Sequence, residues 1–124
     1  MSVQTPIARV EGLGAAHSGT GHFWRQRITA AALVPLSVWF ACVALACIGA
    51  PWKVAIGVLA QPINAIAMAL FILAALQHMT LGLQVVIEDY VHGEGPKIAL
   101  ILFTQFFAWI VGAACLFALV RIVL

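Results

Sequence analysis

Residues 58–87 read VLAQPINAIAMALFILAALQHMTLGLQVVI, a run of 30 residues that contains no Asp, Glu, Lys or Arg. A helix needs about 20 predominantly apolar residues to cross the hydrocarbon core of a bilayer. Inside lipid every backbone polar group must find its partner within the protein, so only helices and closed barrels span membranes. Barrels need at least about eight strands, which a few long segments cannot supply. This run is therefore predicted to form a transmembrane helix.

Two further apolar segments of sufficient length flank this one, at approximately residues 28–48 and 98–122. Breaks that contain glycine and proline separate the three segments, at residues 49–53 and 93–97. The sequence thus predicts an all-α membrane protein with three transmembrane helices, the central one at approximately residues 58–87.

The chain divides accordingly into a polar N-terminal tail, residues 1–27, and a three-helix transmembrane anchor domain, residues 28–124. The tail does not resemble an export peptide, because it has no apolar core of the right length. Pro35 is expected to bend the first transmembrane helix, since proline removes a backbone hydrogen bond from a helix interior. Pro62 is expected in the first turn of the second helix, where proline is tolerated.

The composition supports the membrane class. The chain of 124 residues is 65% hydrophobic and only 8% charged, whereas a soluble domain needs more polar residues to cover its surface. A net charge of +2 provides no basic face for nucleic acid. Three cysteines, Cys42, Cys47 and Cys115, stand in apolar runs and fit no metal spacing. No dinucleotide-binding fingerprint is present, so flavin and iron–sulfur chemistry are expected outside this chain.

The positively charged residues predict the orientation, because Lys and Arg concentrate on the cytoplasmic side of membrane proteins. With a cytoplasmic N-terminus the inside carries four of the six (Arg9, Arg25, Arg27 and Lys97) and the outside carries two (Lys53 and Arg121). The N-terminus is therefore predicted to be cytoplasmic. The tail also lacks the Arg- and Ser-rich composition of an organelle presequence, which favours a bacterial inner membrane.

His78 is the only histidine within the three predicted spans, and ionisable side chains inside a membrane usually mark function. Ala74 and Gly82 share its helix face at the i−4 and i+4 positions. These two small neighbours leave a shallow notch beside the imidazole, which suits a haem whose iron the imidazole binds. They equally suit a histidine that packs between closely spaced helices. Residue spacing leaves both interpretations open.

Tyr90 stands twelve residues after His78, which is about 18 Å along a helix axis. A tyrosine at a membrane boundary is commonly an interface anchor, and a carboxylate beside it commonly a solvated helix end. Together, Asp89 and Tyr90 also suit the headgroup of a quinone, whose reduction takes up protons as well as electrons. Both interpretations again stay open on the chemistry alone.

A specific resemblance narrows these alternatives. The pattern of His78, Gly82, Asp89 and Tyr90, with Gln84 and Val85 between, resembles the signature of the small hydrophobic anchor subunits of succinate dehydrogenase, the D subunits of respiratory complex II. A second block, Arg27-Ile28-Thr29-Ala30, is similar to the entry of that family into its first helix. The resemblance extends over roughly residues 20–124.

The resemblance implies a role for four side chains. His78 matches the histidine that supplies one axial ligand to the iron of haem b. Arg27 matches a basic residue near the haem propionates. Tyr90 matches the tyrosine that hydrogen-bonds ubiquinone, the substrate, and Asp89 matches its neighbouring acid. By contrast, Glu88 matches no role, and His17 and His22 are interpreted as solvated tail residues.

The resemblance also implies partners and a function. The expected function is that of a membrane anchor of succinate:quinone oxidoreductase, in the tricarboxylic acid cycle and aerobic respiratory electron transport. The chain is expected to pack with a cytochrome b (C) anchor subunit, which supplies the second axial ligand to haem b. An iron–sulfur subunit and a flavoprotein subunit complete the expected complex, and membrane lipid surrounds the helices.

Two other interpretations remain. One is a small polytopic transport or proton-relay protein in which His78 and Asp89 relay protons. A continuous relay needs ionisable groups in the other helices, whereas the first and third predicted helices offer as clearly polar interior residues only Thr29, Ser37, Thr104 and Gln105. The other is a structural anchor of the same ancestry that has lost haem.

Overall fold

A computed structural model describes residues 19–124, which form helices and no strand. The helices are α2 (Gly19–Cys47), α3 (Trp52–Leu59), α4 (Pro62–Tyr90) and α5 (Glu94–Val123). Three of them, α2, α4 and α5, are long and apolar enough to cross a membrane. The prediction of an all-α protein with three membrane spans is confirmed.

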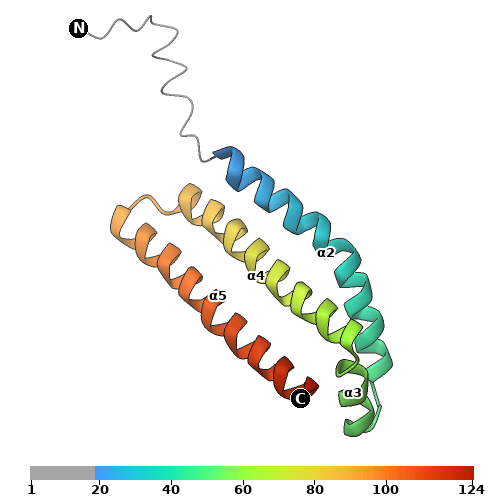
Figure 1. Cartoon of the computed structure of the whole chain (residues 1–124). Coiled ribbons are helices and arrows are strands. Elements are labelled where there is room, and N and C mark those ends of the chain that lie inside the picture. Colours follow the sequence, from blue (N-terminus) through green and yellow to red (C-terminus); the bar gives the residue numbers. More distant parts are fainter. Residues whose placement is uncertain (1–18) are drawn as a thin grey trace, which may run out of the picture.

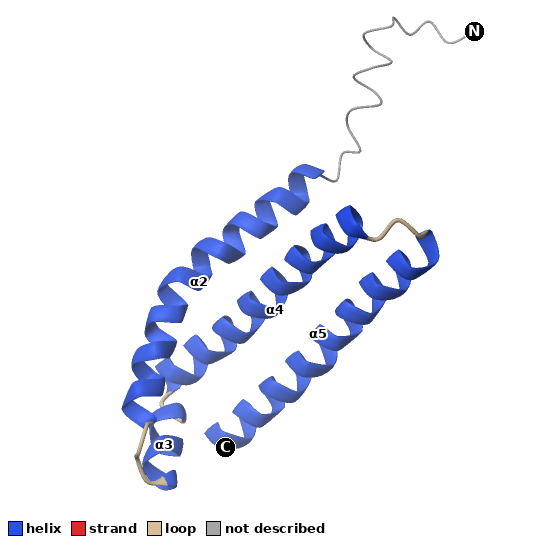
Figure 2. Cartoon of the chain, turned by 180° about the vertical axis from the view of Figure 1, so that it is seen from behind, coloured by secondary structure: helices blue, strands red, loops and turns tan. Residues whose placement is uncertain are grey.

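The three long helices lie side by side with α4 in the middle, and α3 lies at one end of the bundle (Figures 1 and 2). Within the described residues, α2 and α5 each pack against α4 but not against each other. The result is an open layer of helices whose outer faces are available to lipid or to other protein.

The first long helix is longer than its apolar segment. α2 begins at Gly19, nine residues before the apolar segment predicted from Ile28. Its 29 residues span about 43 Å, which exceeds the hydrocarbon thickness of about 30 Å. The division of the chain at residue 27 stays a prediction, because a helix can continue beyond the hydrocarbon. Pro35 lies inside α2, and the helix changes direction along its length (Figure 1), as expected where proline removes a hydrogen bond.

The start of the central span was predicted wrongly by a few residues. Val58 and Leu59 belong to the short helix α3, and α4 begins only at Pro62. The cause is local, because a residue before proline is pushed out of the helical region, and Gln61 indeed has an extended backbone with ψ of 131°. Pro62 occupies the first turn of α4, as predicted.

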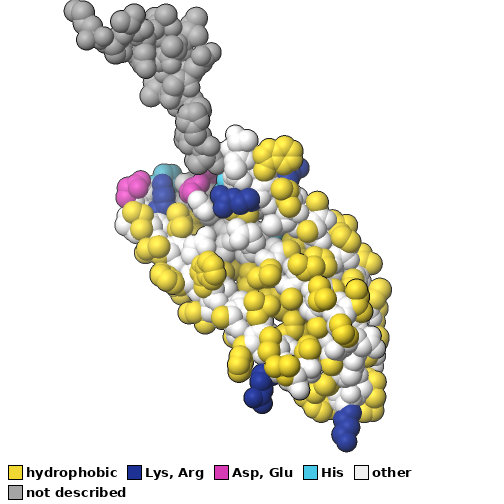
Figure 3. Space-filling view, viewed as in Figure 1, with side chains coloured by type: hydrophobic (Ala, Val, Ile, Leu, Met, Phe, Trp, Pro, Cys, Tyr) yellow, Lys and Arg dark blue, Asp and Glu magenta, His cyan; other side chains and the backbone are white. Residues whose placement is uncertain are grey.

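The interior of this layer is small. Only a few side chains are buried within the described residues, namely Thr80, Leu81, Ile87 and Leu119. Large apolar side chains are instead exposed on every helix, and they cover much of the face that Figure 3 presents. Such an exterior suits lipid hydrocarbon or an apolar partner rather than water.

Gly112 provides the closest approach between α4 and α5. A Cβ atom at this position would lie 3.0 Å from Cδ1 of Leu76, closer than ordinary van der Waals contact. Small residues commonly allow membrane helices to approach in this way. The position therefore leaves little room for any larger side chain.

Replacing Gly112 by leucine is expected to destabilise the packing of α4 against α5 by about 1–3 kcal/mol, the usual cost of overpacking. Gly57→Leu is the matched control, since a Cβ at Gly57 meets nothing within 4 Å. Denaturation of both purified variants in mixed micelles checks this prediction. Equal stability of the two variants would show that the contact with Leu76 is unimportant.

The charged side chains separate between the two ends of the bundle. The start of α2, the end of α4 and the start of α5 meet at one end, and α3 meets the end of α5 at the other (Figure 1). Figure 3 shows acidic side chains at the first end only and basic ones at both. Lys53 and Arg121 belong to the second end, while Arg9 lies outside the described residues. The side of the membrane that each end faces stays a prediction.

Candidate functional site

His78 lies near the middle of α4 and faces α2. Its Nδ1 atom is 3.1 Å from Oγ1 of Thr29, in a partly buried contact between residues 49 positions apart in the chain. The imidazole is half-buried, and within the described residues its Nε2 atom has no hydrogen-bond partner. One nitrogen of the only histidine in the central span is therefore held by α2, and the other remains available.

Thr29 makes further contacts at the same oxygen. Its Oγ1 lies 2.8 Å from the carbonyl oxygen of Arg25 and 3.1 Å from that of Gln26, both on the preceding turn of α2. The hydroxyl is thus attached to the backbone of α2 while it contacts the ring on α4. Thr29 stood out in the sequence as a polar interior residue and as part of the Arg27-Ile28-Thr29-Ala30 block, but its pairing with His78 was not predicted.

The predicted notch beside His78 is partly filled by α2. A Cβ atom on Gly82 would lie 3.6 Å from Nε2 of Gln26, an ordinary van der Waals distance. The side chain of Gln26 on α2 therefore reaches the face of α4 that carries Gly82. Ala74, on the same helix face, is half-buried. Any large planar ligand of His78 has to approach from a side of the imidazole that α2 does not cover.

Asp89 and Tyr90 form the last residues of α4. Both side chains are exposed, and Tyr90 is 78% exposed. Within residues 19–124 neither side chain makes a hydrogen bond or an ion pair. Their polar atoms are therefore free to bind a molecule from outside the chain, about 18 Å along the helix from His78.

Arg27 is not brought to His78 by the fold. It stands two residues before Thr29 on α2, so the two side chains leave the helix in roughly opposite directions. Its guanidinium lies 5.0 Å from the centre of the Phe23 ring, in a cation–π contact. The guanidinium remains exposed, and its predicted role beside haem propionates stays a prediction.

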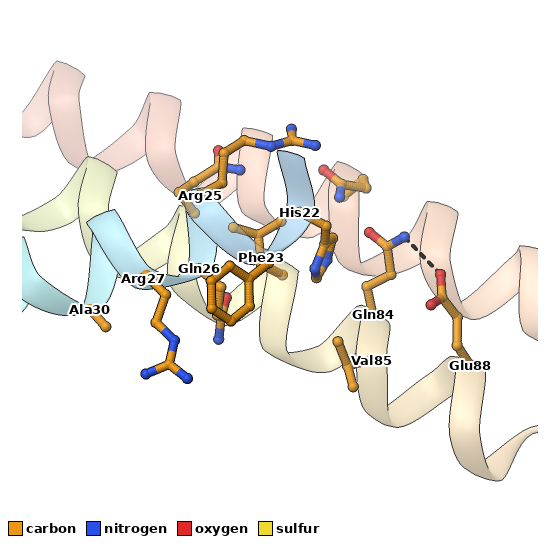
Figure 4. Close-up of a pocket in the computed structure, with 12 residues that line it drawn as sticks. His22, Phe23, Arg25, Gln26, Arg27, Ala30, Gln84, Val85 and Glu88 are labelled. Atoms are coloured by element: carbon orange, nitrogen blue, oxygen red, sulfur yellow. Dashed lines mark hydrogen bonds between the residues drawn. The ribbon is translucent and has the colours of Figure 1, made fainter. Parts of the chain in front are cut away.

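A polar cleft of about 910 Å³ lies beside this region (Figure 4). Its polar lining comes from α2, α4 and α5 and includes His22, Gln26, Gln77, Gln84, Glu88 and Gln105. Two lining atoms, Nε2 of His22 and Oε1 of Gln26, are buried without a hydrogen-bond partner in the described part of the chain. In the same cleft Nε2 of Gln84 donates to Oε1 of Glu88 at 2.8 Å (Figure 4).

This cleft was not predicted, although the sequence contains a signal for it. Gln77, Gln84 and Glu88 follow one another at spacings of seven and four, which places them on one face of α4. His22, predicted to be a solvated tail residue, instead lies on α2 and lines the cleft. His17 lies outside the described residues.

Within the described residues His78 is the side chain to test against a metal group. No cluster of three or more His, Cys, Asp or Glu within residues 19–124 is arranged to hold a metal ion. A haem iron is already held by its porphyrin and needs only axial ligands. His78, whose Nε2 has no partner within the described residues, is a side chain that can serve as such a ligand.

Comparisons with known proteins agree with one another. Residues 1–112 match the model of the succinate dehydrogenase/fumarate reductase transmembrane subunit family. The chain is 37% identical over 117 residues to the succinate dehydrogenase hydrophobic membrane anchor subunit of Paracoccus denitrificans, covering 94% of this chain and 90% of that protein. It is 36% identical to the protein of the same name from Rickettsia bellii, over 82% of each chain. No solved structure matches this chain.

Proposed function

Because the chain belongs to the succinate dehydrogenase/fumarate reductase transmembrane subunit family, we propose that it is the hydrophobic membrane anchor subunit of a succinate dehydrogenase. In this complex it contributes one axial ligand to haem b and part of the ubiquinone-reduction site. The complex serves the tricarboxylic acid cycle and aerobic respiratory electron transport. The observation that carries the proposal is similarity to anchor subunits over nearly the whole length of both chains.

His78 is the proposed axial ligand. Its position near the middle of α4 and its unpartnered Nε2 support this assignment. When bound, haem supplies a one-electron redox centre within the membrane. His78 would hold haem b from one side, and the second ligand would come from a cytochrome b (C) subunit.

Tyr90 and Asp89 are the proposed contribution to the ubiquinone site. The hydroxyl of Tyr90 is suited to donate a hydrogen bond to a quinone carbonyl oxygen, and the carboxylate of Asp89 to pass on a proton. Their exposure at the end of α4 supports the proposal, because a site shared with other subunits needs side chains that project from this one.

The remaining partners are an iron–sulfur subunit and a flavoprotein subunit, which hold the redox groups for which this chain has no motif. We place them on the cytoplasmic side of a bacterial inner membrane, at the end of the bundle that carries Asp89 and Tyr90. The N-terminus would then face the cytoplasm, and Arg27 would be the basic residue near the haem propionates. The family membership favours this proposal over a transport or proton-relay protein.

Removal of this chain tests the assembly. In cells that lack it, we expect succinate oxidation with an artificial acceptor to appear in the soluble fraction, while membrane-bound ubiquinone reduction falls to background. Full-length chain carrying an affinity tag should restore the activity to the membrane and co-purify with three other subunits. Membrane-bound succinate:ubiquinone reduction that persists without the chain would contradict the proposal.

A further inference from the structure

We propose that Thr29 is a positioning residue that sets the protonation pattern and orientation of the His78 ring, so that Nδ1 carries the proton and Nε2 presents its lone pair. The ligand of that lone pair, haem b, rests on the proposed function. The state of the ring itself follows from contacts within this chain.

The first step concerns the single hydroxyl proton of Thr29. Its Oγ1 lies 2.8 Å from the carbonyl oxygen of Arg25 and 3.1 Å from that of Gln26. Carbonyl oxygens only accept hydrogen bonds, and two oxygens at 2.8 Å repel each other unless a proton lies between them. The proton of the hydroxyl therefore points into α2, toward the backbone.

The second step concerns the imidazole. Since the hydroxyl proton is used within α2, Oγ1 of Thr29 can only accept at its third contact, the 3.1 Å contact to Nδ1 of His78. An acceptor at this distance requires Nδ1 to be the protonated nitrogen. In a neutral imidazole the other nitrogen, Nε2, then carries a lone pair. Thr29 thus selects the neutral form of His78 that presents Nε2, rather than Nδ1, to a metal.

The third step concerns orientation. The hydroxyl of Thr29 is fixed to the backbone of α2 by its hydrogen bond to the carbonyl oxygen of Arg25. The hydrogen bond from His78 therefore ties the ring to the backbone of a second helix through a short, rigid connection. Metal-binding histidines are typically fixed in this manner by the nitrogen that does not bind the metal, which also raises the basicity of the one that does.

The contact between Thr29 and His78 could instead serve only to pack α2 against α4. In that role the contact would work equally well with the proton on either nitrogen of the imidazole. A positioning role requires the proton on Nδ1 and an effect on whatever binds Nε2. The two roles are therefore separable by measurement.

The test compares Thr29→Val, which keeps the shape and removes the hydroxyl, with Thr29→Ser, which keeps the hydroxyl. The first measurement uses the full-length chain in lipid nanodiscs with ¹⁵N-labelled histidine, and the signals of His78 are identified by their loss in His78→Leu. We expect ring shifts of an Nδ1-protonated imidazole in the wild type and in Thr29→Ser, and a mixture of both forms in Thr29→Val. A protonated Nε2 in the wild type, or unchanged shifts in Thr29→Val, would overturn the proposal.

The second measurement uses the intact complex. Thr29→Val is expected to lower haem affinity by about 10–100-fold, as loss of such a supporting hydrogen bond typically does, and to raise the haem midpoint potential because the ligand becomes less basic. Thr29→Ser should restore both values, and succinate oxidation with an artificial acceptor confirms assembly. Wild-type affinity and potential in Thr29→Val would also overturn the proposal. A wild-type complex without haem, together with the expected shifts, would instead refute the haem part of the proposed function alone.

Discussion

Replacing His78 by leucine is expected to convert the haem from two axial protein ligands to one and to lower its affinity by at least about 100-fold, since changes that only disturb a ligand indirectly already cost about 10–100-fold. Insertion of α4 should be unaffected because leucine is apolar. The substitution also leaves no unpaired donor on Thr29, because the hydroxyl of Thr29 still donates to the carbonyl oxygen of Arg25 at 2.8 Å. The visible spectrum and haem content of the purified complex check this prediction.

His92 offers a matched control for this experiment. It is exposed in the loop that follows α4, and His92→Leu removes an imidazole from the same chain without touching α2 or the middle of α4. We expect normal haem content in this variant. The assignment of His78 fails if both variants retain haem with unchanged spectra, or if both lose it to the same extent.

Replacing Tyr90 by phenylalanine is expected to lower ubiquinone reduction roughly ten- to a hundredfold. The ring and its interface anchoring remain, but the hydroxyl that donates to a quinone oxygen is lost. A hydrogen bond to an oxygen that gains charge during reaction contributes about 1.5–3 kcal/mol, which gives this range of rates. Haem binding should persist, because His78 lies about 18 Å away along α4. Steady-state kinetics with ubiquinone check the prediction.

The control here is an aromatic residue at the opposite end of the bundle. Trp52, at the start of α3, is 76% exposed, so Trp52→Phe should leave ubiquinone kinetics unchanged. Succinate oxidation with an artificial acceptor that takes electrons before the quinone should stay normal in both variants. Wild-type ubiquinone kinetics in Tyr90→Phe would mean that Tyr90 is an interface anchor only, and Asp89 would lose its strongest support as a proton relay.

The long helices could be predicted from the sequence because a membrane imposes a simple length rule. Three apolar runs near or above 20 residues leave few alternatives to three spanning helices. The short helix α3 escaped prediction, since its eight residues begin inside the predicted break at residues 49–53 and end inside the predicted central run at residues 58–87. The separation of α3 from α4 depends on Pro62. This proline was correctly expected in the first turn of the central helix, but the helix was expected to begin before it.

The candidate site could be predicted only in part. His78 stood out as an ionisable residue inside an apolar span, and Tyr90 through its place in a recognisable pattern. The pairing of His78 with Thr29 could not be predicted, because it depends on how α2 is rotated about its axis against α4, and apolar runs carry little information on rotation. For the same reason the spacing around His78 could not decide between a ligand notch and a close helix contact at Gly82, which in the structure faces Gln26 of α2.

The most direct test of the central claim identifies the axial ligands of the iron in the wild-type complex. Near-infrared magnetic circular dichroism and low-temperature electron paramagnetic resonance of the oxidised complex, purified through a tag on this chain, distinguish a low-spin iron with two histidine ligands from other coordination. We expect two histidine ligands in the wild type and a single one in His78→Leu. A complex that reduces ubiquinone but contains no haem, or one that keeps two histidine ligands after His78→Leu, would contradict the claim that this chain supplies an axial ligand.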